Sequence, residues 1–161
     1  MEAYLDIETT GLSPCADAIT VVGIYRRYPD GYRMAQLVGP DITRAAVEGL
    51  LEGVEALYTY NGIRFDAVFL ESRLQVEFPR TLAHKDLMHD CWRRGLYGGL
   101  KSVERQLGIE RKLLGVSGRQ AVDLWWRYVR TGDEAALHTL LRYNKEDVLN
   151  LKVLRERLAV D

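Results

Sequence analysis

Two acidic side chains lie two positions apart near the start of the chain, within the stretch YLDIETTGLSP at residues 4–14. The residues around Asp6 and Glu8 are of the β-strand type, and side chains at positions i and i+2 of a strand leave the same face. Like charges held side by side raise each other's pKa unless a cation compensates them. Mg²⁺ and similar hard cations prefer such carboxylate oxygens. The pair is therefore a candidate metal site, and an acidic pair on an edge strand or turn is the alternative.

Three further polar residues have positions that suit the same chemistry. Asp66 follows the dipeptide Asn61-Gly62 at the predicted start of a helix, where an aspartate is also a preferred N-cap. Tyr143 and Asp147 lie four positions apart in the helical stretch LLRYNKEDVLNL, so they share one face of that helix. A structural hydrogen bond between the two would explain the same spacing.

The size and composition are those of an ordinary soluble domain. The chain has 161 residues, of which 47% are hydrophobic and 28% charged, and we expect residues 1–161 to form one domain. No apolar run approaches the ~18 residues of a membrane span, and the N-terminus lacks the basic and then apolar layout of a signal peptide. Cys15 and Cys91 form neither a disulfide framework nor a C-x-x-C motif, which favours free thiols in a reducing cytoplasm. We therefore expect a cytoplasmic protein, and with no membrane span we expect no membrane partner.

The charges are distributed unevenly along the chain. Residues 91–130 contain nine basic and three acidic residues, a net charge of +6, whereas the whole chain carries −1 and the remainder therefore −7. This asymmetry is typical of a phosphate-facing surface beside an acidic site, although solvated helix faces would give the same pattern.

The elements that must position these residues follow from the hydrophobic pattern. Strands are predicted at residues 2–9, 18–28, 32–38, 54–62 and 81–88, and helices at 41–53, 64–74, 98–108, 117–132 and 133–158. The core stripe of the last helix is predicted as Leu137, Leu141, Val148, Leu151, Leu154 and Leu158. Three strands followed by alternating helices and strands indicate an α/β fold, with a mixed sheet flanked by helices.

Taken together, three short motifs resemble a known family. DIETTGLSP near the N-terminus, NGIRFD about sixty residues later and YNKED near the C-terminus are similar to the three motifs of the DEDD 3′–5′ exonuclease superfamily, which has the ribonuclease H-like fold. With GLYGGLKSVERQLGI at residues 95–109, they look closest to the YprB ribonuclease H-like domain family. Tyr143, four residues before Asp147, matches the tyrosine subclass. The resemblance implies a five-stranded sheet in the order 3-2-1-4-5, with strand 1 central and strand 2 antiparallel.

The family resemblance also implies roles for the acidic residues and the tyrosine. Asp6 would bridge two divalent cations, Mg²⁺ or Mn²⁺, with Glu8 and Asp147 completing one metal site and Asp66 supporting the other, largely through water. Tyr143 would orient the attacking water more than act as a base, because a tyrosine pKa lies near 10. The implied activity is hydrolysis of phosphodiester bonds at the 3′ end of single-stranded DNA or RNA, with release of 5′-mononucleotides.

Other residues near these motifs are candidate substrate contacts. In the family, the chain turns past the terminal nucleotide directly after the acidic pair, although a plain strand-to-loop turn would also need a glycine there. Lys101, Ser102 and Arg105 lie at the start of the helix predicted at residues 98–108. The N-terminus of a helix favours anions, and the Lys101 charge adds to this attraction for phosphate. Asp86, at the end of the fifth predicted strand, is interpreted as an exposed strand-end acid, and a residue that supports the metal ligands is the alternative. The predicted substrate-binding residues are Thr9, Thr10, Gly11, Leu12, Asn61, Lys101, Ser102 and Arg105.

Two other functions suit the same fold. A non-catalytic nucleic-acid-binding module would keep the basic segment, and a structure-selective endonuclease would keep the acidic residues. All five expected active-site residues are present, which favours an enzyme.

Overall fold

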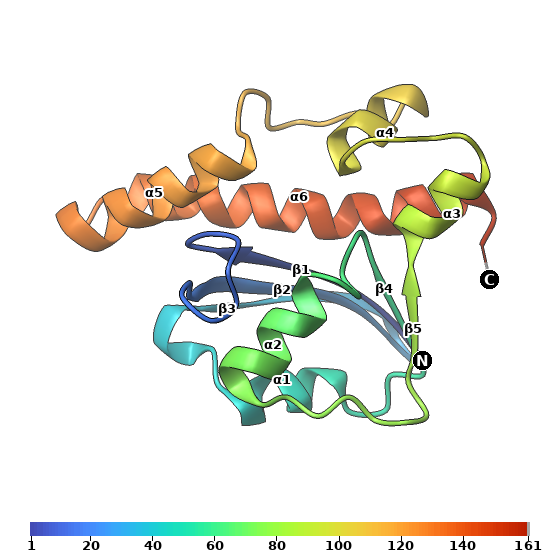
Figure 1. Ribbon diagram of the computed structural model, residues 1–161, viewed down its shortest axis with the longest axis horizontal. Coiled ribbons are helices and arrows are strands. Elements are labelled where there is room, and N and C mark those ends of the chain that lie inside the picture. The colour runs from blue at the N-terminus through green and yellow to red at the C-terminus, as the bar shows by residue number, and fades with distance from the viewer. Residues whose placement is uncertain (161) are drawn as a thin grey trace.

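A five-stranded mixed sheet forms the centre of the computed structural model, which describes residues 1–160 (Figure 1). Its strands are β1 (Glu2–Thr9), β2 (Ile19–Tyr28), β3 (Gly31–Val38), β4 (Ala56–Thr59) and β5 (Ala83–Asp86). They lie in the order β3-β2-β1-β4-β5, with β2 antiparallel to β1 and β3, and β4 parallel to β1 and β5. The predicted sheet order, with the first strand central, is confirmed.

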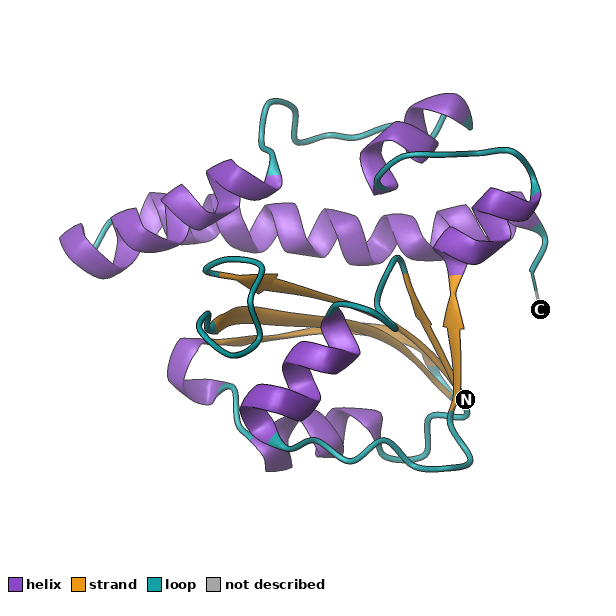
Figure 2. Ribbon diagram, in the orientation of Figure 1, coloured by secondary structure: helices purple, strands orange, loops and turns teal. Residues whose placement is uncertain are grey.

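Helices cover both faces of the sheet (Figure 2). One face carries α1 (Arg44–Leu51) and α2 (Asp66–Leu74), and the other is crossed by α6 (Glu134–Leu158). Around α6 lie α3 (Leu87–Arg93), α4 (Leu100–Gln106) and α5 (Gly118–Thr131), and a short 3₁₀ helix, η1 (Gly39–Asp41), follows β3. Within residues 1–160, no helix combines the length and apolar character that crossing a membrane requires.

The alternation of side chains along β1 decides which face of the sheet receives the acidic pair. Leu5 and Ile7 belong to the apolar cluster beneath α1 and α2, whereas Tyr4 belongs to the cluster beneath α6. Because every second residue of a strand points to the same face, Asp6 and Glu8 share the face of Tyr4. The acidic pair therefore points toward α6.

The central strand extends beyond its parallel neighbour. β1 pairs with β4 only between Glu2 and Tyr4, whereas its pairing with β2 continues to Thr9 and places Asp6 opposite Gly23. The end of β1 that carries the acidic pair thus has a strand on one side only. On its other side, backbone groups of β1 must find partners outside the ladder.

Two predicted strands are shorter than expected. β4 ends at Thr59 because the chain then turns sharply through Asn61, whose φ is +61°, and Gly62, where a Cβ atom would lie 2.3 Å from Thr59 Cβ. β5 ends at Asp86, and residues predicted to continue it begin α3, a helix that the hydrophobic pattern did not indicate. The helix starts there because the Asp86 side chain accepts the Met88 N–H as an N-cap.

The core stripe of the long α6 is confirmed in its C-terminal half and wrong in its N-terminal half. Val148, Leu151, Leu154 and Leu158 are buried, but Leu137 and Leu141 are only half-buried. The buried positions of the N-terminal half are instead Ala136, Leu140, Tyr143 and Asn144. Hydrophobic periodicity did not predict this shift because part of the buried face is polar.

Candidate functional site

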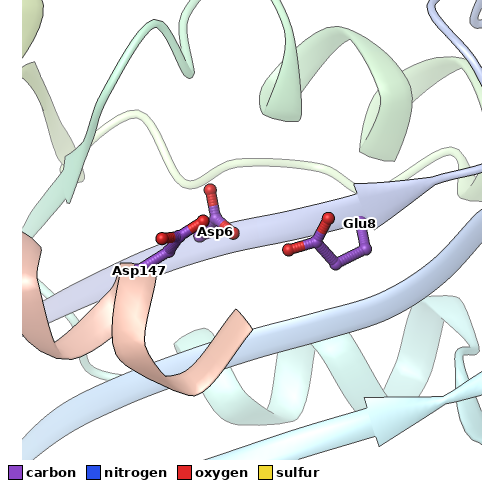
Figure 3. Close-up of side chains that lie close together, drawn as sticks. All are labelled: Asp6, Glu8 and Asp147. Atoms are coloured by element: carbon purple, nitrogen blue, oxygen red, sulfur yellow. The ribbon is translucent and has the colours of Figure 1, made fainter. Parts of the chain in front are cut away.

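Three carboxylates from two distant parts of the chain converge above the central strand. Asp6 and Glu8 on β1 and Asp147 on α6 each offer an oxygen, and these oxygens all lie within 4.8 Å of one another. Figure 3 shows the three side chains between the strand and the helix. The structure thus brings together three of the four predicted metal-binding residues in one cluster.

Asp66, the fourth predicted metal-binding residue, is tied to the backbone of the same strand. It is the first residue of α2, and its Oδ1 accepts the Ile7 N–H at 3.0 Å, from the residue between Asp6 and Glu8. This contact occurs where β1 has passed the end of β4. The N-cap of α2 is Phe65, so Asp66 does not have the capping role that its position also suggested. Its carboxylate is buried beside the cluster.

An asparagine that the sequence analysis did not single out fixes the position of Asp6. Asn144 Nδ2 donates to the backbone oxygen and to Oδ2 of Asp6, both at 3.1 Å. Gln36 Nε2 on β3 donates to Asn144 Oδ1 at 2.9 Å and thereby sets the orientation of the amide. Gly23 permits this approach, because a Cβ atom there would lie 2.2 Å from Asn144 Oδ1. The only sequence signal was the place of Asn144 inside the YNKED motif.

The cluster carries more negative charge than its own hydrogen bonds compensate. Two effects raise the pKa values of Asp6 and Glu8 well above their usual range. The larger is burial away from water, and the smaller is repulsion from neighbouring carboxylates. Burial also raises the pKa of Asp66 to about 7 and that of Asp147 to about 6, although Arg111 opposes the latter shift. Among the residues that the structure describes, no donor reaches the buried Glu8 Oε1.

These observations fit a divalent cation. The donor set consists of carboxylate oxygens, which are the preferred ligands of Mg²⁺ and Mn²⁺. A buried carboxylate oxygen without a partner is costly unless a cation or another donor satisfies it, and Glu8 Oε1 is such an atom. Asp6, Glu8 and Asp147 can hold a metal ion together, with Asp66 adjacent.

Tyr143 lies on the same face of α6, one turn before Asp147, and is buried. Burial and the nearby charges of Asp147 and Glu8 raise the pKa of Tyr143 above its usual value, so its phenol keeps its proton at neutral pH. Lys101 Nζ lies 4.2 Å from the centre of the tyrosine ring. The same ammonium donates to the backbone oxygen of Val116, which holds it beside the cluster.

Arg111 is the cation that the structure places directly on the acidic cluster. In the sequence it is one of nine basic residues in a long segment, with no spacing that relates it to Asp147. It nevertheless donates to Asp147 Oδ1 and to both oxygens of Glu104. Its side chain is 10% exposed. No local pattern could have identified it, because 36 residues separate the two partners.

The predicted contacts after the acidic pair form a tightly closed loop. Thr9 Oγ1 donates to the backbone oxygen of Gly11 at 2.6 Å, and Thr10 Oγ1 accepts the Ala18 N–H at 2.9 Å. A Cβ atom on Gly11 would lie 2.4 Å from the Asp17 carboxylate, so any larger residue there would displace the Asp17 side chain. The two hydroxyls thus stabilise the loop, and Leu12 projects from it with 84% exposure.

The predicted phosphate contacts on α4 lie at different distances from the cluster. Lys101 is beside it, whereas Ser102 is half-buried on the outer part of the helix near Tyr97. Arg105 is exposed and lines a pocket of about 400 Å³ together with Lys101 and Arg111. Glu104 and apolar residues such as Ile109 and Leu113 also line this pocket, which adjoins the acidic cluster through Arg111.

The interpretation of Asp86 as an exposed strand-end acid is wrong. Asp86 is buried, and its Oδ1 accepts the N–H groups of Asn61 at 2.8 Å and Met88 at 3.1 Å. Its Oδ2 accepts the Ile63 N–H at 3.3 Å. The carboxylate thus ties the turn after β4 to the start of α3. The turn geometry at Asn61 is accounted for by this contact.

Comparisons with known proteins agree with this architecture. A family model described as the RNase_H superfamily matches residues 3–159. The uncharacterized protein YprB of Bacillus subtilis is 31% identical over 163 residues, and the alignment covers 92% of this chain and 39% of YprB.

Two solved structures share the fold at low sequence identity. The family B DNA polymerase from the hyperthermophilic archaeon Pyrobaculum calidifontis has a TM-score of 0.74 at 18% identity, over 98% of this chain and 24% of the polymerase. The zinc-bound complex of E. coli ExoI with single-stranded DNA has a TM-score of 0.53 at 15% identity, over 93% of this chain and 45% of ExoI. The chain spans less than half the length of YprB and of both these proteins.

The family match extends over almost the whole chain, and the sheet order is the one that the three motifs implied. The resemblance to YprB is likewise confirmed by sequence identity. The chain belongs to the RNase H superfamily.

Proposed function

We propose that residues 1–161 form a metal-dependent 3′–5′ exonuclease domain that releases 5′-mononucleotides from single-stranded DNA or RNA. The observation that carries this proposal is the convergence of Asp6, Glu8 and Asp147, with a buried glutamate oxygen that the described chain leaves unpartnered. The ExoI structure, a complex with single-stranded DNA, supports the same class of substrate. Lys101 and Arg105, which line the adjoining pocket, support a polyanionic substrate.

Each acidic residue has a distinct part in the proposed mechanism. Asp6, Glu8 and Asp147 would hold one divalent cation, and Asp6 with Asp66 a second, Mg²⁺ or Mn²⁺ in each case. Such ions, when bound, supply positive charge to the phosphate and lower the pKa of water. Asn144 keeps the Asp6 carboxylate in place for this task, and Ile7 does the same for Asp66.

Tyr143 and Lys101 act on the substrate side of the proposed mechanism. Because the phenol of Tyr143 keeps its proton, we assign it the task of orienting the attacking water through its oxygen, not that of a base. Lys101, fixed over the tyrosine ring, would contact a phosphate oxygen. Ser102 and Arg105 would contact phosphates further along the strand.

The loop after β1 is assigned to the terminal nucleotide. Leu12 is the exposed apolar residue of this loop and would pack against the last base. The backbone of Thr9, Thr10 and Gly11 would contact the sugar, because the hydroxyls of Thr9 and Thr10 already stabilise the loop. Asn61 would approach the Asp66 side of the site from the turn after β4.

The direct test is cleavage of 5′-labelled single-stranded DNA and RNA oligonucleotides with Mg²⁺, Mn²⁺ or EDTA, followed on denaturing gels. We expect a metal-dependent ladder that shortens from the 3′ end, and its absence in Asp6→Ala. Asp30→Ala, which removes an exposed aspartate in the β2–β3 turn, is the matched control and should cleave as the wild type does.

The other outcomes of this test distinguish the alternatives. Cleavage of a circular or 3′-blocked oligonucleotide would replace the exonuclease by an endonuclease. Binding to the oligonucleotide without cleavage under either metal would indicate a nucleic-acid-binding module. Full activity of Asp6→Ala would refute the assignment of the site.

A further inference from the structure

Arg111 connects the acidic cluster to a segment that has no other part in the proposed mechanism. It lies in the connection between α4 and α5, residues 107–117, which we call the α4–α5 connection. Its Nη2 donates to Asp147 Oδ1 and, at 3.0 Å, to Glu104 Oε1, while its Nε donates to Glu104 Oε2. One guanidinium therefore bridges a predicted metal-binding carboxylate on α6 and a carboxylate on α4.

The second carboxylate of this bridge is buried more deeply than the first. Glu104 is 1% exposed, and its Oε1 also accepts from Asn150 Nδ2 at 3.0 Å. Asn150 lies on α6, almost one turn after Asp147. Glu104 is thus fixed by two donors, and the guanidinium that it holds has little freedom to leave Asp147.

The backbone of the α4–α5 connection is attached to the same part of α6. Glu146, next to Asp147, accepts the backbone N–H groups of Lys112 and Leu113, the latter at 3.1 Å. The connection is anchored at its other end by the Lys101 ammonium on the Val116 oxygen. These contacts hold the backbone around Arg111 in place, in addition to the contacts of its guanidinium group.

The chemistry of the bridge requires an arginine. A guanidinium presents several N–H donors in a rigid plane and can serve two carboxylates together, whereas a lysine ammonium is a compact point charge. Partners that hydrogen-bond to metal-ligating carboxylates fix the orientation of these ligands, and their loss typically weakens metal binding.

We propose that Arg111 is a positioning residue for the divalent cation: by bridging Glu104 and Asp147, it holds the Asp147 carboxylate toward Asp6 and Glu8. This inference rests on the proposed metal site. It assigns to the α4–α5 connection the task of preparing the site before the metal arrives. This role is consistent with the position of the Arg111 guanidinium, which binds Asp147 but does not reach Glu8. In the described chain, Glu8 Oε1 therefore stays available to a metal ion.

Arg155, on α6, provides a matched control. It is also an arginine with little exposure, and it joins α6 to β1 through Glu2 and the Tyr4 hydroxyl. Neither of these partners belongs to the acidic cluster. Loss of Arg155 should therefore weaken the packing of α6 without altering the metal site.

The experiment is calorimetric titration of the full chain with Mn²⁺ alone, without nucleic acid, for the wild type, Arg111→Met, Arg111→Lys and Arg155→Met. Thermal unfolding in EDTA establishes which variants are folded. We expect Arg111→Met to bind Mn²⁺ about 10- to 100-fold more weakly. Arg111→Lys should recover only part of this loss, and Arg155→Met should bind as the wild type does.

The results separate failure of this inference from failure of the proposed function. Wild-type affinity or tighter binding in Arg111→Met overturns the positioning role alone, and so does full recovery in Arg111→Lys, which would show that charge suffices. If Arg111→Met does not fold, Arg111→Lys decides: about tenfold weaker binding supports the inference, and wild-type binding overturns it. A wild type that binds no Mn²⁺ refutes the metal site itself, and this inference with it.

Discussion

Asp86, at the end of β5, and Glu8, near the end of β1, are both buried carboxylates of the same sheet, but their surroundings are opposite. The two oxygens of Asp86 accept three backbone N–H groups and join the turn after β4 to α3. In the described chain, Glu8 Oε1 has no donor, and Asp147 and Asp66 repel its charge. Burial alone therefore does not separate these two carboxylates. The buried oxygen without an internal donor sets Glu8 apart from Asp86.

The course of β1 explains why the two carboxylates differ. At the end of β5, the turn after β4 and the first turn of α3 supply N–H groups around the Asp86 carboxylate. Glu8 instead lies in the part of β1 that has passed β4 and points toward α6, where it meets carboxylates. We therefore expect Asp86 to matter for stability and Glu8 for activity.

The largest effect is expected for Glu8→Gln. An amide of nearly the same shape removes the charge that a divalent cation requires, so nuclease activity should fall about 10³-fold. Because the wild-type carboxylate is buried and its Oε1 has no donor among the described residues, the free energy of unfolding in EDTA should stay the same or rise. Single-turnover cleavage and urea unfolding of the same preparation measure both quantities. A variant with wild-type cleavage would remove Glu8 from the proposed mechanism.

Asp86→Ala should have the opposite effect. Removal of the carboxylate leaves three backbone N–H groups without their acceptor and should lower the free energy of unfolding by about 3 kcal/mol. Asp86→Asn keeps one acceptor oxygen and should lose less. Urea unfolding measures the loss, and cleavage well below the unfolding temperature should remain near the wild-type rate. If Asp86→Ala is stable but inactive, the comparison between the two carboxylates fails.

The metal-free protein should become less stable as the pH rises. The pKa values of Asp66 and Asp147 are raised to about 7 and about 6 in the folded chain, so both carboxyls bind protons more tightly when folded than when unfolded. Their contribution is complete below the unfolded pKa of about 4 and disappears as the pH passes through 6 and 7. In EDTA, Tm should therefore fall by about 5 °C between pH 5 and pH 8.

Two further measurements identify the source of this pH dependence. Asp66→Asn should flatten the dependence of Tm on pH, because one titrating group is removed. Mn²⁺ added at pH 8 should restore Tm, because it compensates the ionised carboxylates. A Tm in EDTA that rises from pH 5 to pH 8 would contradict this prediction. It would show that ionisation of the clustered carboxylates does not destabilise the folded protein.

The smallest effect is expected for Leu12→Ala. The side chain is 84% exposed, so its loss should leave the free energy of unfolding unchanged. If Leu12 packs against the terminal base, KM for a single-stranded oligonucleotide should rise about fivefold. Val129→Ala, at an exposed apolar position on α5, is the control. Equal KM values for all three proteins would remove the loop after β1 from the substrate site.

The features of this protein that depend on local spacing could be predicted from the amino-acid sequence. Positions two apart in a strand share a face, which predicted that Asp6 and Glu8 act together. The three motifs implied the sheet order with β1 central, and the apolar spacing placed Val148, Leu151 and Leu154 in the core. The structure confirms both the order and these buried residues.

Which polar groups have hydrogen-bond partners became visible only in the folded chain. Arg111 reaches Asp147 across 36 residues, and Asn144 reaches Asp6 across 138, so neither contact leaves a local pattern. For the same reason, the sequence could not distinguish the satisfied Asp86 from the unsatisfied Glu8. Hydrophobic periodicity records where apolar side chains are buried, but the cost of burying a carboxylate depends on donors that folding alone brings to it.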